Sequence, residues 1–160
     1  MNALRGRGAA RAVADLGAGS ILASVEIAAT PERIFQALAS REIVDWWGKP
    51  GVFDAREWSG DVRVGGNWRA SGMGRDGLPW ELEGKFLEAD PPRRLSHTWN
   101  TPGSTVEPSV VTYLLEKIDG GTRITLCHVG VSDRDSCMGA CMGWESCLTQ
   151  LAARLGALNP

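Results

Sequence analysis

The feature that most constrains the fold of this sequence is a series of short extended segments, separated by turn signals and followed by one long helical pattern. The extended segments are expected at residues 52–58, 62–70, 79–89, 93–100, 109–118 and 122–130. Residues that tolerate a positive φ lie between several of them, at Gly65-Gly66, Asp76-Gly77 and Asp119-Gly120-Gly121. Pro91-Pro92 cannot lie in a central strand, so it marks a corner between two strands. This pattern favours consecutive antiparallel hairpins.

One strand and two short helices are expected before these hairpins. Apolar and polar residues alternate from Ile21 to Ala28, as in a strand with one buried face. Thr30 and Pro31 suit the N-cap and the first position of a helix. A second short helix should end near Trp47, because Gly48 and Pro50-Gly51 oppose its continuation. The sheet would then contain about seven strands.

The last segment repeats apolar residues at the spacing of one helix face. This stripe consists of Cys137, Cys141, Trp144, Leu148, Leu151 and Leu155. Ser132 or Asp133 can cap the start of this helix, and Gly156 lies near its end. A long helix laid across a curved antiparallel sheet is an α+β, two-layer arrangement. We expect one domain over residues 20–158, preceded by a flexible arm over residues 1–19.

The order of these signals resembles the activator-of-heat-shock-protein-90-ATPase-like family of the START-like (SRPBCC) superfamily. The matching motifs are Trp46-Trp47-Gly48, D-x-R-x-G-G at 61–66, L-E-A-D-P-P-R-R-L from Leu87, G-G-T-R-I-T-L from Gly120, and Gly143-Trp144. The resemblance covers about Ile21 to Leu155 and implies the helix-grip fold, in which a curved sheet wraps around a long C-terminal helix and encloses an apolar pocket. Relatives often have a His three residues before the matching glycine. Ala140 stands there in this chain, so chemistry proposed for that His is not carried over.

The tryptophans suggest what such a pocket would contain. Seven Trp and one Tyr are spread over almost every expected element, and an indole combines a large apolar area with one N–H donor. The candidate ligand-binding residues are Trp68, Trp80, His97, Trp99, Tyr113, Cys141 and Trp144. The function expected first is therefore binding of a small apolar or aromatic molecule, without a fixed cofactor.

Two other functions remain open at this stage. His97 alternates with Leu95 and Trp99, so it could act as an acid or base in a pocket enzyme of the cyclase, dehydratase or hydrolase type. His128 lies beside Cys127 in the last strand, on the opposite face, and either histidine could instead be a structural strand residue. The family name also suggests a protein-interaction module that stimulates a chaperone ATPase. No catalytic motif is recognisable.

The composition limits which binding partners and which cellular compartment we expect for this protein. A formal net charge of −2 does not favour nucleic acid, and the apolar stretches are too short for a membrane helix. We expect a cytoplasmic monomer or homodimer with reduced cysteines and no metal site. Cys137 and Cys141 are interpreted as core residues, and redox or soft-metal sensing is the alternative.

Overall fold

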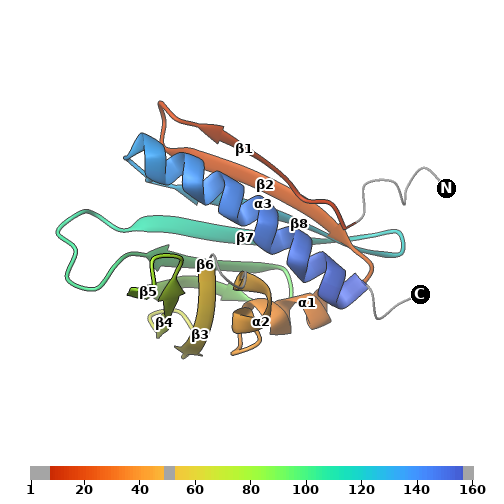
Figure 1. Ribbon diagram of the computed structural model, residues 1–160. Coiled ribbons are helices and arrows are strands. Elements are labelled where there is room, and N and C mark those ends of the chain that lie inside the picture. Colours follow the sequence, from red (N-terminus) through yellow and green to blue (C-terminus); the bar gives the residue numbers. More distant parts are fainter. Residues whose placement is uncertain (1–7, 49–52, 157–160) are drawn as a thin grey trace.

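The computed structural model describes residues 8–48 and 53–156, which form eight strands and three helices. The strands are β1 (Arg11–Asp15), β2 (Ser20–Ile27), β3 (Phe53–Gly60), β4 (Asn67–Gly74), β5 (Pro79–Asp90), β6 (Arg94–Trp99), β7 (Ser109–Ile118) and β8 (Gly121–Val129). The helices are α1 (Pro31–Leu38), α2 (Ile43–Trp47) and α3 (Arg134–Gly156). Figure 1 shows α3 lying along the sheet, with α1 and α2 near its C-terminal end.

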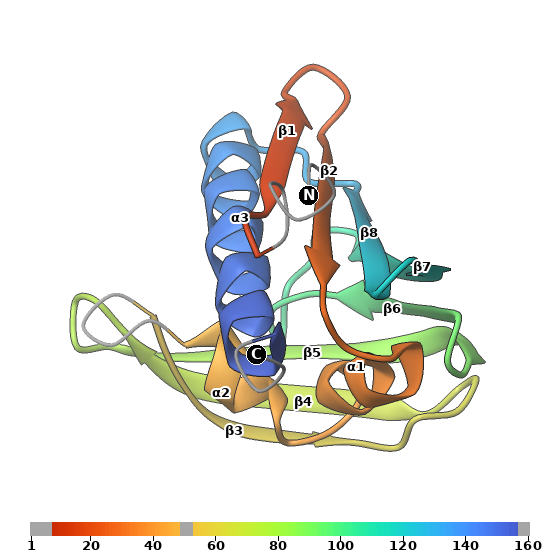
Figure 2. The same ribbon diagram turned by 90° about the vertical axis from the view of Figure 1, so that its right-hand side faces the viewer.

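All strands belong to one antiparallel sheet in the order β1-β2-β8-β7-β6-β5-β4-β3. The sheet bends strongly, so that β3, β4 and β5 run in a clearly different direction from β1, β2 and β8 (Figure 2). Helix α3 lies inside this bend and packs against β1, β2 and α2. The expected α+β helix-grip architecture is therefore confirmed, with eight strands where about seven were expected.

The additional strand is β1, which lies in the segment that we expected to be an arm. It pairs with β2 from Arg11↔Ser24 to Asp15↔Ser20. Helix α3 satisfies its other edge, because the Ala10 N–H donates to Thr149 Oγ1 (3.1 Å) and the Ala12 N–H donates to Glu145 Oε2 (2.9 Å). Residues 11–15 are thus part of the domain. Their partners come from the other end of the chain, which local sequence patterns do not reveal.

The local signals for the helices are confirmed. Thr30 caps α1 by accepting a hydrogen bond from the Arg33 N–H, and Pro31 is its first residue. Helix α2 ends at Trp47, while Pro50-Gly51 lies outside the described residues. Asp133 caps α3, because its carboxylate accepts the Ser136 N–H at 2.8 Å.

One extended segment is displaced from its expected position. We expected residues 62–70 to be extended, but β4 begins at Asn67 and continues to Gly74. Residues 61–66 instead form a tight turn, in which the Arg63 N–H donates to the Asp61 carbonyl and the Gly66 N–H to the Arg63 carbonyl. A Cβ on Gly66 would lie 1.9 Å from the Asp61 carbonyl oxygen, so the turn requires glycine there.

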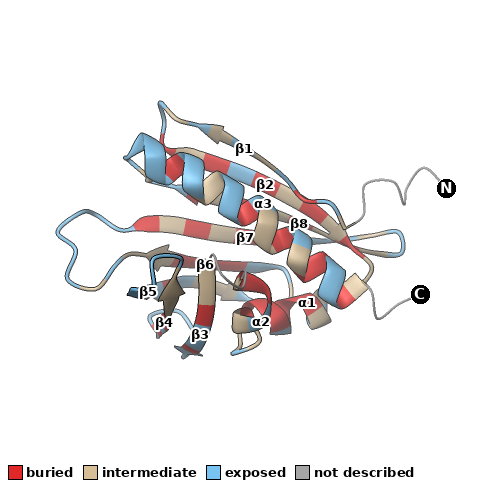
Figure 3. Ribbon diagram, viewed as in Figure 1, coloured by how far each residue is buried: buried red, intermediate tan, exposed pale blue. Residues whose placement is uncertain are grey.

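The core lies between the concave face of the sheet and α3 (Figure 3). Ile21, Ala23, Val25 and Ile27 of β2 are buried, as their alternation predicted. The α3 stripe is buried at Cys137, Trp144, Leu148, Leu151 and Leu155, whereas Cys141 is only partly buried. Over residues 8–48 and 53–156, no helix has both the length and the apolar character needed to cross a membrane.

The turn between β1 and β2 contains Gly19, which packs closely against the backbone of Val131, just before α3. Gly19 has a φ of +68°, and a Cβ there would lie 2.4 Å from the Val131 carbonyl oxygen. We expect Gly19→Ala to lower the free energy of unfolding by more than about 3 kcal/mol, because a left-handed Ala costs about 1–2 kcal/mol and a backbone clash adds to it. Urea unfolding followed by circular dichroism would measure this.

Gly65 provides the matched control for this substitution. Its φ is +85°, but a Cβ there would have nothing within 4 Å. Gly65→Ala should therefore cost about 1–2 kcal/mol, the backbone term without the clash. Equal losses for the two variants would contradict the contact assigned to Gly19.

Candidate functional site

Aromatic side chains from six elements meet between the sheet and α3. We call this group the aromatic cluster; it consists of Trp47, Trp68, His97, Trp99, Tyr113, His128 and Trp144. Their ring centroids are 5.1 to 6.3 Å from those of neighbouring members. The curvature of the sheet brings β4 and β6 to the same interior as β8 and α3, which are distant in sequence.

The cluster contains five of the seven residues predicted from the sequence to bind a ligand. These are Trp68, His97, Trp99, Tyr113 and Trp144. Trp80 lies elsewhere and stacks on Phe53, with centroids 4.5 Å apart and planes at 8°. Its ring occupies the space beside Gly72, its partner on β4, where a Cβ would lie 2.6 Å from the indole. Cys141 is partly exposed on α3.

Sequence reasoning did not select Trp47 and His128 as site residues. His128 continues the buried alternation of Thr122, Ile124 and Leu126 along β8, a signal that would have placed it on the concave face. Trp47 carried no such signal, because α2 is too short to show a periodicity. Its neighbour Trp46 points toward α1 and donates to the Ala37 carbonyl, so adjacent tryptophans serve different parts of the core.

Trp99 is the partly exposed ring at the centre of the cluster. Its centroid lies 5.2 to 6.3 Å from those of Trp47, Trp68, His97, His128 and Trp144. The indole nitrogens of Trp68 and Trp144 donate hydrogen bonds, to the Thr98 carbonyl and to His128. Among the described residues the Trp99 indole nitrogen has no hydrogen-bond partner, so ring contacts hold this side chain in place.

His128 connects α3 to the sheet through a chain of hydrogen bonds. Trp144 Nε1 is 3.0 Å from His128 Nδ1, and His128 Nε2 is 2.8 Å from Ser109 Oγ. Because an indole N–H can only donate, Nδ1 must accept, and in the neutral imidazole the proton resides on Nε2. Nε2 then donates to Ser109 Oγ, which donates to the Trp99 carbonyl at 3.2 Å. Every polar atom of this imidazole therefore has a partner.

His97 is held in the opposite tautomer. Its Nδ1 lies 3.0 Å from the Thr98 carbonyl oxygen, which can only accept, so Nδ1 carries the proton. In the neutral imidazole Nε2 is then a bare acceptor, and it has no partner among the described residues. Burial lowers the pKa of His97 to about 4, against a smaller opposing effect of the Thr98 hydrogen bond. Burial likewise lowers the pKa of His128 to about 4, with a further contribution from His97.

A second group of polar atoms lies where α2, β7 and α3 meet. The Trp47 indole N–H is buried without a hydrogen-bond partner. The Tyr113 hydroxyl lies near this N–H, but the two groups do not meet in hydrogen-bond geometry. Burial and the nearby Cys147 thiol raise the pKa of Tyr113 well above its usual value, whereas the interaction with Trp47 lowers this pKa by less, so the hydroxyl stays protonated. Burial also raises the pKa of Cys147 to about 12.

The cysteines do not converge with other metal ligands in the part of the chain that the structure describes. No group of three or more His, Cys, Asp or Glu side chains lies close enough there to hold a metal ion. All four cysteines are free thiols. Cys147 donates weakly to the Trp47 carbonyl at 3.5 Å, and Cys137 lies 3.9 Å from the Ser20 carbonyl. Both thiols therefore pack between α3 and the neighbouring elements, as small apolar side chains do.

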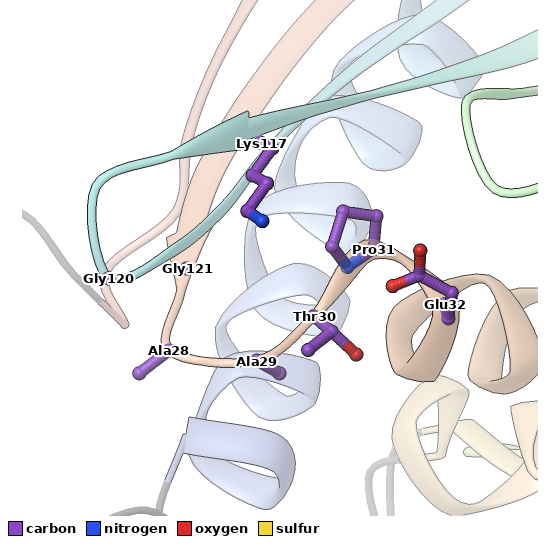
Figure 4. A pocket seen from close by; sticks show the side chains of 8 residues that line it. All are labelled: Ala28, Ala29, Thr30, Pro31, Glu32, Lys117, Gly120 and Gly121. Atoms are coloured by element: carbon purple, nitrogen blue, oxygen red, sulfur yellow. The ribbon is translucent and has the colours of Figure 1, made fainter.

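Two surface hollows lie outside the aromatic cluster. One, of about 230 Å³, lies where the β7–β8 turn meets the start of α1, with Lys117 and Glu32 on its wall (Figure 4). The other, also of about 230 Å³, lies over β3, β4 and β5 and includes Glu57, Arg69 and Glu81. Neither hollow is lined by a member of the aromatic cluster, so neither is the apolar pocket that the resemblance implies between the sheet and α3.

Because both histidines are buried in neutral form, we expect the free energy of unfolding to fall in weak acid. Both are neutral in the folded protein down to about pH 4, whereas an unfolded histidine takes up a proton near pH 6.5. The unfolded state therefore binds more protons between these values. We expect the free energy of unfolding to fall by about 1–1.5 kcal/mol per histidine between pH 7.5 and 5.5.

Urea unfolding of the wild type and of His97→Asn at both pH values measures this effect. An Asn amide can still donate to the Thr98 carbonyl, but it does not titrate. The variant should keep about half of the wild-type pH dependence, which would come from His128. A wild-type stability that is equal at the two pH values would show that these imidazoles are not buried in neutral form.

Comparison with known proteins matches this chain to one protein family. The family model described as "Activator of Hsp90 ATPase homolog 1-like protein" matches residues 28–156. The search of curated proteins found no match. Solved structures that resemble the chain include protein Ms6760 from Mycobacterium smegmatis, with 25% identity, a TM-score of 0.78, and coverage of 91% of this chain and 96% of that one.

Two further solved structures have the same fold at lower identity. A protein from Rhodobacter sphaeroides has 23% identity and a TM-score of 0.75, covering 93% of this chain and 100% of its own. CalU16 from Micromonospora echinospora has 24% identity and a TM-score of 0.63, covering 89% and 81%. Because the family match extends over most of the sequence, the chain belongs to the activator of Hsp90 ATPase homolog 1-like family of START-like proteins.

Proposed function

We propose that this protein reversibly binds a small, flat, mainly apolar or aromatic molecule within the aromatic cluster. The observation that carries the proposal is the state of Trp99, a partly exposed ring surrounded by buried aromatic side chains and held by ring contacts. A side chain in this position can leave the cluster without breaking a hydrogen bond of its own. A ligand ring can then take its place.

The cluster offers a suitable surface for such a ring. Tilted and edge-on rings 5 to 6 Å apart are the arrangement that aromatic groups prefer, and a bicyclic ligand in the place of an indole would preserve it. The apolar area that the ligand buries is roughly offset by the indole that moves into water. We therefore expect a modest affinity in the wild type, limited by the displacement of Trp99.

The histidines support binding more than acid–base catalysis. A pKa of about 4 makes the His97 imidazole a weak base near neutral pH, whereas its bare Nε2 remains a good hydrogen-bond acceptor. His128 is fully engaged by Trp144 and Ser109. The free thiols fit a reducing, cytoplasmic compartment, which is part of this proposal.

Substitution of Trp99 tests the proposal with the neutral fluorescent probe N-phenyl-1-naphthylamine. Trp99→Ala should bind the probe about tenfold more tightly than the wild type, because the binding-competent state no longer requires displacement of a ring. Trp80→Ala is the matched control, since Trp80 is also partly buried but stacks on Phe53 outside the cluster. Thermal unfolding would confirm that both variants are folded.

Two outcomes would contradict the proposal. One is that neither the wild type nor Trp99→Ala binds the probe saturably. The other is that Trp80→Ala gains as much affinity as Trp99→Ala, which would place the probe outside the cluster.

A further inference from the structure

We infer that the ligand is a neutral planar molecule with a hydroxyl group that both donates and accepts a hydrogen bond, as in a phenol, and that it is held by His97, Trp47 and Tyr113. This inference rests on the proposed function and specifies the ligand's chemistry. It follows from two polar atoms of the aromatic cluster that are paired with no described residue, the Trp47 indole N–H and His97 Nε2. The Trp47 N–H is also buried, which is costly, and a ligand that accepts its hydrogen bond recovers that cost.

The acceptor side of the site is His97. Its Nδ1 proton is committed to the Thr98 carbonyl, which also accepts the Trp68 indole N–H at 3.1 Å. The imidazole is therefore fixed from two sides, because Trp68 packs against it with centroids 5.1 Å apart. Nε2 remains as an acceptor on a buried side chain that is 6% exposed. A ligand O–H or N–H can donate a hydrogen bond to this nitrogen.

The donor side is Trp47 with Tyr113. The Trp47 indole N–H is buried and unpaired on a side chain that is 3% exposed. The Tyr113 hydroxyl stays protonated and can add a second donor or an acceptor. Trp47 and His97 both contact Trp99, at 5.2 and 6.3 Å between centroids. A molecule that replaces the Trp99 ring would therefore lie beside both side chains.

The charge of the cluster selects against ionic ligands. No Lys, Arg, Asp or Glu side chain is buried among the described residues, and both imidazoles are neutral at pH 7. The remaining imidazole, His128, has both nitrogens occupied by Trp144 and Ser109 and cannot compensate an anion. A carboxylate brought into this interior would lose its hydration without a cationic partner.

Four naphthalene probes separate these requirements at nearly constant ring size. 2-Naphthol has a neutral hydroxyl, 2-methoxynaphthalene has an acceptor without a donor, naphthalene has neither, and 2-naphthoate is an anion at pH 7. Isothermal titration calorimetry should give 2-naphthol an affinity about tenfold above naphthalene, a gain typical of one or two neutral hydrogen bonds. 2-Methoxynaphthalene should fall between them, and 2-naphthoate should bind more weakly than naphthalene.

Variants that keep an aromatic ring then assign the groups. Trp47→Phe and His97→Phe should each reduce the preference for 2-naphthol over naphthalene about threefold to tenfold, leaving naphthalene binding nearly unchanged. Trp80→Phe is the matched control, because it also removes a buried, unpaired indole N–H, but from the Phe53 stack. It should leave the preference intact.

The results distinguish this inference from the proposed function. If naphthalene and 2-naphthol bind equally well, or if Trp47→Phe and His97→Phe do not change the preference, the ligand class is wrong while binding in the cluster stands. Tighter binding of 2-naphthoate than of 2-naphthol would also overturn the inference. If none of the four probes binds, the proposed function fails as well.

Discussion

The structure depends on how one long helix is fixed inside a bent sheet. Most of the contact between α3 and the concave face is apolar and does not by itself define a rotation of the helix. The hydrogen bond from the Trp144 indole to His128 does, because it requires one direction of the indole and one tautomer of the imidazole. Ser109 then completes the chain to the Trp99 carbonyl, at the end of β6.

This arrangement gives the two interior histidines different roles. His128 is a structural residue whose nitrogens are both used, whereas His97 uses one nitrogen and leaves the other free. The same burial that keeps both neutral makes the free nitrogen of His97 a selective acceptor. The Trp47 N–H is the complementary unused donor. A fully self-satisfied core would have no such pair of atoms around a partly exposed ring, and this is why we interpret the interior as a binding site.

Much of the fold could be predicted from the sequence because its signals are local. The Thr30 cap, the end of α2 and the stripe on α3 depend on residues within a few positions of each other. Strand β1 was missed because its edge is satisfied by Thr149 and Glu145, more than 130 residues away. The grouping of rings in the candidate site could be predicted only in part. Alternation placed His97 and Trp99 on one face, but the position of Trp47 depends on sheet curvature, and the separation of Trp80 depends on the space beside Gly72.

In our interpretation a ligand enters the interior at Trp99 and contacts Trp47. A ¹H–¹⁵N spectrum of the indole N–H groups, recorded during titration with 2-naphthol and with each resonance assigned by substitution, would observe this entry. We expect large shifts for Trp99 and Trp47, and none for Trp80 in its stack on Phe53. Saturable shifts confined to Trp80, or to other tryptophans outside the aromatic cluster, would show that the ligand binds elsewhere.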